Sequence, residues 1–196
     1  MSIERMLLLS SMALAAIAFA APAVAQADVT LTENNQPLAA GIGVIATSTN
    51  FVTTFGSGIE VTCAKVTLHY EVEANNDEEV VLQPTQSHNA TTENCKLTTT
   101  NAVPEVGHPV TFTNFGFGEL TINTWGTGVV GATLTNGPCN YTGNVHVETT
   151  ANTTDILKAT GSTLAAPGCP TGTMHGDFTL ETSNGTAVTL HSVSTG

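Results

Sequence analysis

The chain has few basic residues. Lysine and arginine together number four among 196 positions, against sixteen aspartates and glutamates, and the formal net charge is −12. The one arginine, Arg5, is close to the amino terminus. An acidic surface repels nucleic acids and anionic lipids, and arginine is the side chain that most often clamps phosphate or carboxylate groups. We therefore expect no nucleic-acid partner and no anionic substrate.

Sequence patterns typical of catalysis and of metal sites are also missing. The chain has no G-x-S-x-G elbow, no C-x-x-C pair and no two histidines at H-x-H or H-x-x-x-H spacing. The acidic run Asp77-Glu78-Glu79 lacks the spacing of a calcium loop. His175 and Asp177 fall on one side of a predicted strand, but an acid–base role would also need a nucleophile such as serine nearby. We predict a protein that is not an enzyme and needs no metal or cofactor.

Residues 1–27 have the features of a secretory signal peptide. Arg5 belongs to a short charged start, an apolar run covers 6–20, and Ala25-Gln26-Ala27 is a small-x-small cleavage pattern. We predict cleavage after Ala27 and a secreted, extracellular protein. No later apolar run approaches the roughly 18 residues of a membrane helix. We therefore expect no membrane span once the leader is removed, and a single domain over 28–196.

The four cysteines predict disulfide bonds. An even number of cysteines in an exported chain is typical of a disulfide framework, and here it indicates two bonds. Sequential pairing, Cys63 with Cys95 and Cys139 with Cys169, is favoured because the two pairs are separated by nearly equal stretches of chain. The two other pairings stay open at this point.

The rest of the composition predicts an all-β fold. Threonine supplies about a fifth of residues 28–196, and threonine and valine favour strands. Polar and apolar residues alternate in many short runs, most clearly over 139–148. Turn residues separate the runs, and Asn184-Gly185 predicts a tight hairpin. We predict an antiparallel β-sandwich, or a flattened barrel, of about ten short strands with two disulfides.

One detail of the alternation predicts a bend. Between 59 and 72 the apolar positions are odd up to Cys63 and even from Val66. A slip of one residue moves side chains to the other face of a sheet. The sequence therefore predicts a β-bulge or bend at Ala64-Lys65.

Trp125 is the candidate ligand-binding residue. It is the only tryptophan and belongs to the polar segment Asn123-Thr124-Trp125-Gly126. An indole ring at the surface can contact a sugar or an alkane, whereas one in the core or at its rim serves packing. Both interpretations stay open.

The placement of cysteines and glycines resembles that of known proteins. The features that carry the resemblance are Gly41 and Gly43 at a strand entry, Ile59-Glu60-Val61-Thr62-Cys63, Cys95, Gly137-Pro138-Cys139, Gly168-Cys169 and Thr171-Gly172-Thr173-Met174. In these the chain resembles small secreted bacterial proteins of unknown role, especially actinobacterial ones, and more loosely the family called protein activator of alkane oxidation. The resemblance implies a non-enzymatic secreted protein at the cell surface, in the biofilm matrix or at a hydrocarbon–water boundary.

Two functional expectations follow. The first is a secreted, non-catalytic structural or interaction protein of the cell surface or extracellular matrix, with copies of itself or surface and matrix components as partners. The second is an extracellular binding module for a carbohydrate or an apolar ligand. Threonine-rich strands with open edges can also accept a strand from a neighbour. The sequence does not identify the ligand or the oligomeric state.

Overall fold

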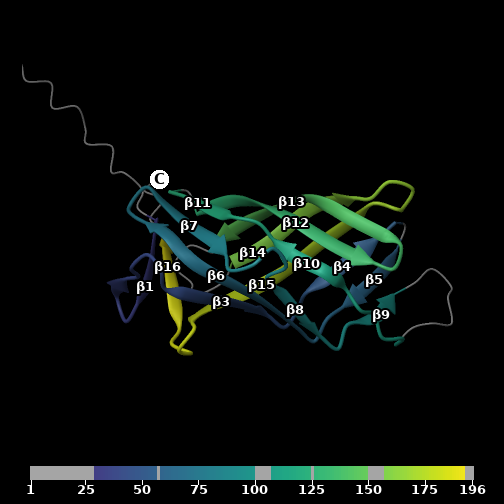
Figure 1. Ribbon diagram of the computed structural model, residues 1–196, viewed down its shortest axis with the longest axis horizontal. Coiled ribbons are helices and arrows are strands. Elements are labelled where there is room, and N and C mark those ends of the chain that lie inside the picture. The colour runs from purple at the N-terminus through teal and green to yellow at the C-terminus, as the bar shows by residue number, and fades with distance from the viewer. Residues whose placement is uncertain (1–28, 57, 100–106, 125, 150–156, 193–196) are drawn as a thin grey trace, which may run out of the picture.

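The computed structural model describes residues 29–56, 58–99, 107–124, 126–149 and 157–192, and this part of the chain folds as antiparallel β-structure (Figure 1). The predicted leader, residues 1–27, lies outside the described residues. The strands are β1 (Val29–Glu33), β2 (Gln36–Pro37), β3 (Gly43–Ser48), β4 (Val52–Phe55), β5 (Ile59–Thr62), β6 (Lys65–Asn75), β7 (Glu79–Pro84), β8 (Ala90–Glu93), β9 (Lys96–Thr99), β10 (Thr113–Phe117), β11 (Leu120–Asn123), β12 (Thr127–Asn136), β13 (Cys139–Thr149), β14 (Leu157–Ala165), β15 (Gly172–Thr182) and β16 (Val188–Ser192).

Eight of these strands form a closed barrel. Their order is β14-β13-β12-β11-β7-β6-β3-β15, and the pairing of β14 with β15 closes the ring. The all-β antiparallel prediction is confirmed, and of its two forms the barrel is the one found. β4, β5 and β9 extend the sheet from β15, β8 pairs with β6, and β10 pairs with β12. No helix with the length and apolarity of a membrane span occurs in the described part of the chain.

Long strands change partners along their length, and this bends the barrel wall. β15 pairs with β3 over Thr179–Thr182 and with β4 over Gly172–His175. The predicted bend at Ala64-Lys65 is confirmed, because β5 ends at Thr62 and β6 begins at Lys65. β5 pairs with β4 and β9, whereas β6 pairs with β3, β7 and β8.

Two segments differ from what their sequence predicts. The polar composition of residues 84–95 predicts a loop, but β8 lies within them. Its residues Ala90–Glu93 are all at least partly exposed, so the segment has no buried apolar alternation to reveal it. The pattern over residues 41–51 predicts a strand with Ile42, Val44 and Ala46 on one face, yet 38% of Ile42 is exposed, because β3 begins only at Gly43. The predicted hairpin is present, with Gly185 at φ +79° in its turn, but β16 then leaves β15 to pair with β1.

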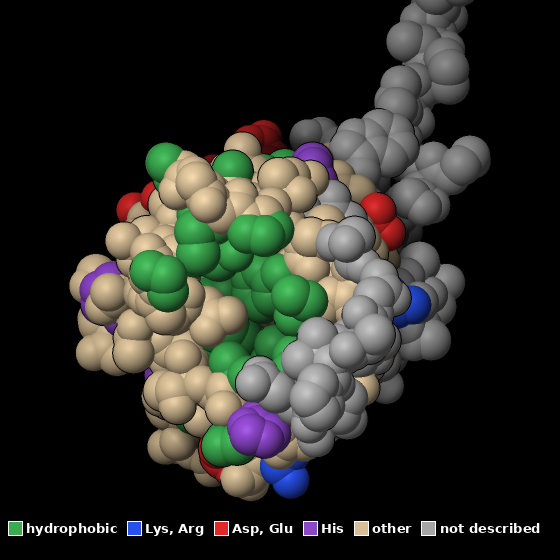
Figure 2. All heavy atoms as spheres, turned by 90° about the vertical axis from the view of Figure 1, so that its right-hand side faces the viewer, with side chains coloured by type: hydrophobic (Ala, Val, Ile, Leu, Met, Phe, Trp, Pro, Cys, Tyr) green, Lys and Arg blue, Asp and Glu red, His purple; other side chains and the backbone are tan. Residues whose placement is uncertain are grey.

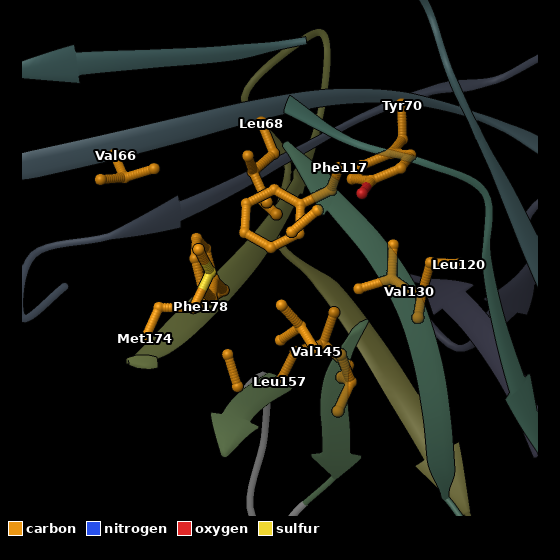
Figure 3. Packing of buried hydrophobic residues seen from close by; sticks show 14 of the residues in the cluster. Val66, Leu68, Tyr70, Phe117, Leu120, Val130, Val145, Leu157, Met174 and Phe178 are labelled. Atoms are coloured by element: carbon orange, nitrogen blue, oxygen red, sulfur yellow. The ribbon is translucent and has the colours of Figure 1, made fainter. Parts of the chain in front are cut away.

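The barrel interior is filled with apolar side chains. Figure 3 shows side chains from different strands that point toward one another, among them Leu68, Tyr70, Phe117, Leu120, Val130, Val145, Leu157 and Phe178. The space that they leave is a void of about 30 Å³. Burial of each large apolar side chain contributes roughly 1.5–3 kcal/mol, so this interior is the main source of stability. An eight-stranded barrel is just wide enough for its own side chains to fill it.

A small three-stranded sheet covers one end of the barrel. It has the order β16-β1-β2, and its buried apolar side chains include Val29, Leu31 and Val188, each 0% exposed. The side chain of Asn75, at the end of β6, fixes this sheet to the barrel. Its amide oxygen accepts a hydrogen bond from the Leu31 backbone N–H (2.8 Å), and its amide nitrogen donates to the carbonyls of Leu31 (2.8 Å) and Leu38 (2.9 Å). One side chain thus satisfies three backbone groups beside β1.

We expect Asn75→Ala to lower the free energy of unfolding by about 2 kcal/mol, because it leaves the Leu31 N–H and the Leu38 carbonyl without their partner, whereas the Leu31 carbonyl keeps the Leu38 N–H at 2.9 Å. Urea denaturation of the mature chain measures this change. The matched control is Asn144→Ala, at an exposed position on β13, which should change stability by less than about 0.5 kcal/mol. Equal effects of the two substitutions would contradict the role of Asn75.

One buried hydroxyl has no partner. Thr53, on β4, is 0% exposed and faces inward opposite Val61 and Met174. Its Oγ1 is sealed from solvent and makes no hydrogen bond in the described part of the chain. Burial of a hydroxyl without a hydrogen bond destabilises the folded state.

Thr53→Val should therefore stabilise the protein by about 1 kcal/mol, since it replaces the unpartnered hydroxyl by a methyl group of similar volume. Thermal unfolding of the two proteins tests this. Thr54→Val, on the partly exposed face of the same strand, serves as the control and should have little effect. A Thr53→Val protein that is less stable than the wild type would show that the hydroxyl does have a partner.

Candidate ligand-binding site

The two ends of the barrel are built differently. At the end under β1 and β16, which we call the capped end, inward-facing Val72, Val80 and Ile122 are at most 1% exposed. At the opposite end, the β12–β13 turn and the β14–β15 loop project side by side (Figure 1). The disulfide Cys139–Cys169 joins these two connections, and we call this the disulfide end.

The second disulfide, Cys63–Cys95, joins the β5–β6 junction to the β8–β9 junction. Both strand pairs bend there, and Cys63 and Cys95 are buried at 0% and 4% exposure. The predicted sequential pairing is thus confirmed for both bonds. Two disulfides indicate a protein suited to an oxidising compartment.

The interior opens to solvent at the disulfide end. Phe55 and Ile59 are directly opposite each other in the pairing of β4 with β5, two positions from the pair Thr53 and Val61. Alternate residues of a strand share a face, so Ile59 faces inward as Val61 does. Val61 is 1% exposed, whereas Ile59 is 44% exposed. An inward-facing isoleucine with this exposure is at the rim of an opening.

Figure 2 views the molecule from this side and shows a hollow in which apolar side chains gather. Register and ring contacts place five apolar residues together at this end, namely Phe55, Ile59, Leu97, Phe112 and Tyr141. Leu97 is opposite the inward-facing Val61 and is only partly buried. We call this feature the apolar hollow.

Aromatic rings connect the apolar hollow with the barrel interior. The ring centroids of Tyr141 and Phe55 are 4.9 Å apart, those of Phe55 and Phe112 are 6.5 Å apart, and those of Phe112 and Phe115 are 6.0 Å apart. Phe115 in turn lies 5.4 Å from Phe117, which lines the interior void. Tilted ring pairs at these separations attract one another beyond the effect of burial alone. The hollow therefore has a rigid aromatic floor.

The two tyrosines of the interior differ in their hydrogen bonding. Burial raises the pKa of Tyr70, and a hydrogen bond with the Asn89 side chain opposes this shift only in part. Burial also raises the pKa of Tyr141. Both phenols are therefore neutral at physiological pH and remain able to donate a hydrogen bond.

Trp125, the residue singled out by the sequence, lies outside the described residues. Its neighbours Asn123 and Thr127 line an open groove of about 680 Å³ on the outer wall of the barrel, with Thr121, Gly128, Val129, His146, Val147, Glu148 and Thr160. The Asn123 side chain accepts hydrogen bonds from the backbone N–H (3.2 Å) and hydroxyl (3.1 Å) of Thr127. This groove is open to solvent and has a mixed polar and apolar lining.

The remaining candidates from the sequence have structural partners. His175 is exposed, while Asp177 Oδ2 accepts a hydrogen bond from Asn50 Nδ2 at 2.9 Å. Ser48 is 0% exposed, and its hydroxyl donates a hydrogen bond to Asn50 Oδ1 at 3.0 Å. Asn50 thus links the side chains of Ser48 and Asp177, and Ser48 is not placed as a nucleophile beside His175.

The acidic run Asp77-Glu78-Glu79 forms a turn in which Asn76 Oδ1 accepts both backbone N–H groups of Glu78 and Glu79, at 2.9 Å each. Within the described ranges, no three histidine, cysteine or acidic side chains are grouped as metal ligands would be.

Two residues important for the architecture had no signal in the sequence. Asn89 fits a glycosylation pattern, but it is 0% exposed. Its amide donates to the His69 carbonyl (3.2 Å) and accepts from the Phe117 N–H (2.9 Å). In the sequence, Tyr141 is one of several alternating positions of a predicted strand and has no feature that sets it apart. Burial and ring contacts alone distinguish it.

The loops closed by the two disulfides span 32 and 30 residues. The chain-entropy model therefore predicts nearly equal losses, about 3–4 kcal/mol each, on replacing either pair by alanine. Urea denaturation of the variants Cys63→Ala/Cys95→Ala and Cys139→Ala/Cys169→Ala tests this. A variant as stable as the wild type would show that its bond does not form in solution.

Comparison of the chain with protein-family models, with curated proteins and with solved structures gave no match.

Proposed function

We propose that this protein is a secreted, non-catalytic binding protein that holds an apolar molecule in the apolar hollow at the disulfide end of its barrel. The observation that carries the proposal is Ile59, an inward-facing isoleucine that is 44% exposed while inward-facing residues at the capped end are sealed. A concave apolar surface with few polar groups is the usual form of a small-molecule site.

The barrel interior itself is too full to hold the ligand. Its void of about 30 Å³ is far below the roughly 300–1,000 Å³ of typical ligand pockets. The ligand would therefore rest on the aromatic floor formed by Phe55, Phe112 and Tyr141 rather than enter the barrel. Eight-stranded barrels with one open end are a common scaffold for such binding.

The predicted export agrees with the same role. The predicted leader over residues 1–27 and the two disulfides suit a protein that acts outside the cell. The resemblance to the family called protein activator of alkane oxidation agrees with an apolar ligand met at a hydrocarbon–water boundary or on the cell surface. The apolar hollow favours this role over the carbohydrate-binding alternative, for which the outer groove near Asn123 would be the site.

A neutral fluorescent probe tests the proposal. N-phenyl-1-naphthylamine brightens when it leaves water for an apolar site, and we expect the mature protein to bind it saturably. Ile59→Asp should weaken this binding at least tenfold, because it puts a charged carboxylate on the inward face of the hollow. The matched control is Val129→Asp, since Val129 is equally exposed (48%) but lies on the outer wall.

No saturable probe binding by the wild type would overturn the proposed function. Equal losses in Ile59→Asp and Val129→Asp would move the site away from the hollow. Circular dichroism of each variant shows whether the β-fold is retained, which is expected because both substituted side chains are largely exposed.

A further inference from the structure

The hydroxyl of Tyr141 is a polar group among the apolar side chains of the hollow. Tyr141 faces inward on β13 opposite Leu134, and it is 3% exposed. Its ring lies 4.9 Å from that of Phe55. No residue in the described part of the chain forms a hydrogen bond with its hydroxyl, whereas the Asn89 side chain interacts with the hydroxyl of Tyr70.

The Tyr141 hydroxyl is also accessible. Among the described side chains, the one hydroxyl that is both sealed and unpartnered belongs to Thr53. Tyr141 is unpartnered, so its oxygen must keep some contact with the space outside the packed interior. The open space beside Tyr141 is the apolar hollow, because its ring contacts that of Phe55, and Phe55 is directly opposite the rim residue Ile59. A buried tyrosine usually finds a partner for its hydroxyl, and here a bound molecule can supply it.

The charges around the hollow restrict the ligand further. Lys65 lies 4.0 Å from Glu93 in an ion pair on β6 and β8. Lys158, on β14, is directly opposite Glu148 of β13 and Asp177 of β15 on the outer wall. Lys96 is adjacent to the inward-facing Leu97 on β9 and so points outward. None of these three lysines faces the hollow, so a carboxylate bound there would have no lysine partner.

We infer that the ligand of the apolar hollow is an uncharged molecule with an apolar chain and one oxygen that accepts a hydrogen bond from the Tyr141 hydroxyl. A long-chain ketone, ester or alcohol has this chemistry, whereas an alkane, a fatty acid or an alkylamine does not. The inference rests on the proposed function, because it names the ligand class of the same site.

Displacement of the neutral probe by four eight-carbon compounds tests this inference: octane, 2-octanone, octanoate and octylamine. 2-Octanone should displace the probe at the lowest concentration. Tyr141→Phe should lower the ratio of 2-octanone affinity to octane affinity about fivefold, the usual effect of one net hydrogen bond. Tyr70→Phe is the matched control, since it removes the other interior tyrosine hydroxyl and should not alter the ratio of octanone to octane affinity.

The outcomes separate the two proposals. If the wild type binds the probe but prefers octane, octanoate or octylamine, or if Tyr141→Phe leaves the octanone-to-octane ratio unchanged, the inference fails and the proposed function stands. If the wild type does not bind the probe, the proposed function itself fails. The comparison of octanone with octane on the wild type needs no variant, so it decides the matter even if Tyr141→Phe does not fold.

Discussion

The pairing of β14 with β15 closes the sheet on itself, and the rest of the molecule depends on this closure. An open eight-stranded sheet would leave two rows of unpaired backbone groups and an apolar face in water. Closure pairs the two outer strands over Leu157–Leu164 and Gly172–Phe178, and it encloses the inward-facing side chains. Gly143 permits the close approach of β13 to β14 beside this seam, because a Cβ there would lie 2.3 Å from the carbonyl oxygen of Thr163.

A closed barrel still has two ends, and this chain treats them differently. The capped end is sealed by the first and last strands, which the Asn75 side chain fixes to β6. The disulfide end is held in shape by covalent bonds instead, which allows its apolar surface to stay open without loss of the fold. The aromatic rings from Tyr141 to Phe117 join this surface to the packed interior. The open surface is thus supported by the same contacts that stabilise the barrel.

The sequence predicted those features that depend on local pattern. Alternation over 139–148 gave β13, the phase slip at Ala64-Lys65 gave the change of partners between β5 and β6, and cysteine spacing gave both disulfides. Features that depend on contacts distant in sequence were not predictable. Asn75 meets Leu31 across 44 residues, and an asparagine at the end of a strand looks like any turn residue.

The candidate site shows the same division. The sequence pointed to Trp125 as an aromatic residue of unusual position, but the apolar hollow is formed by residues whose apolar character looked like ordinary core. Ile59 and Val61 have the same pattern in the sequence, and only the end of the barrel makes one of them exposed. Likewise, only the structure shows that the hydroxyl of Thr53 is sealed from solvent and has no partner in the described part of the chain.

The most direct test of this account is methyl NMR with a neutral nitroxide, which broadens the signals of methyl groups at apolar surfaces that it reaches. The account predicts strong broadening at Ile59 and Leu97, weaker broadening at Ile42, which is 38% exposed but outside the hollow, and almost none at Val29, Leu31 and Val188. Equal broadening at the capped and disulfide ends, or no more at Ile59 than at Ile42, would contradict it.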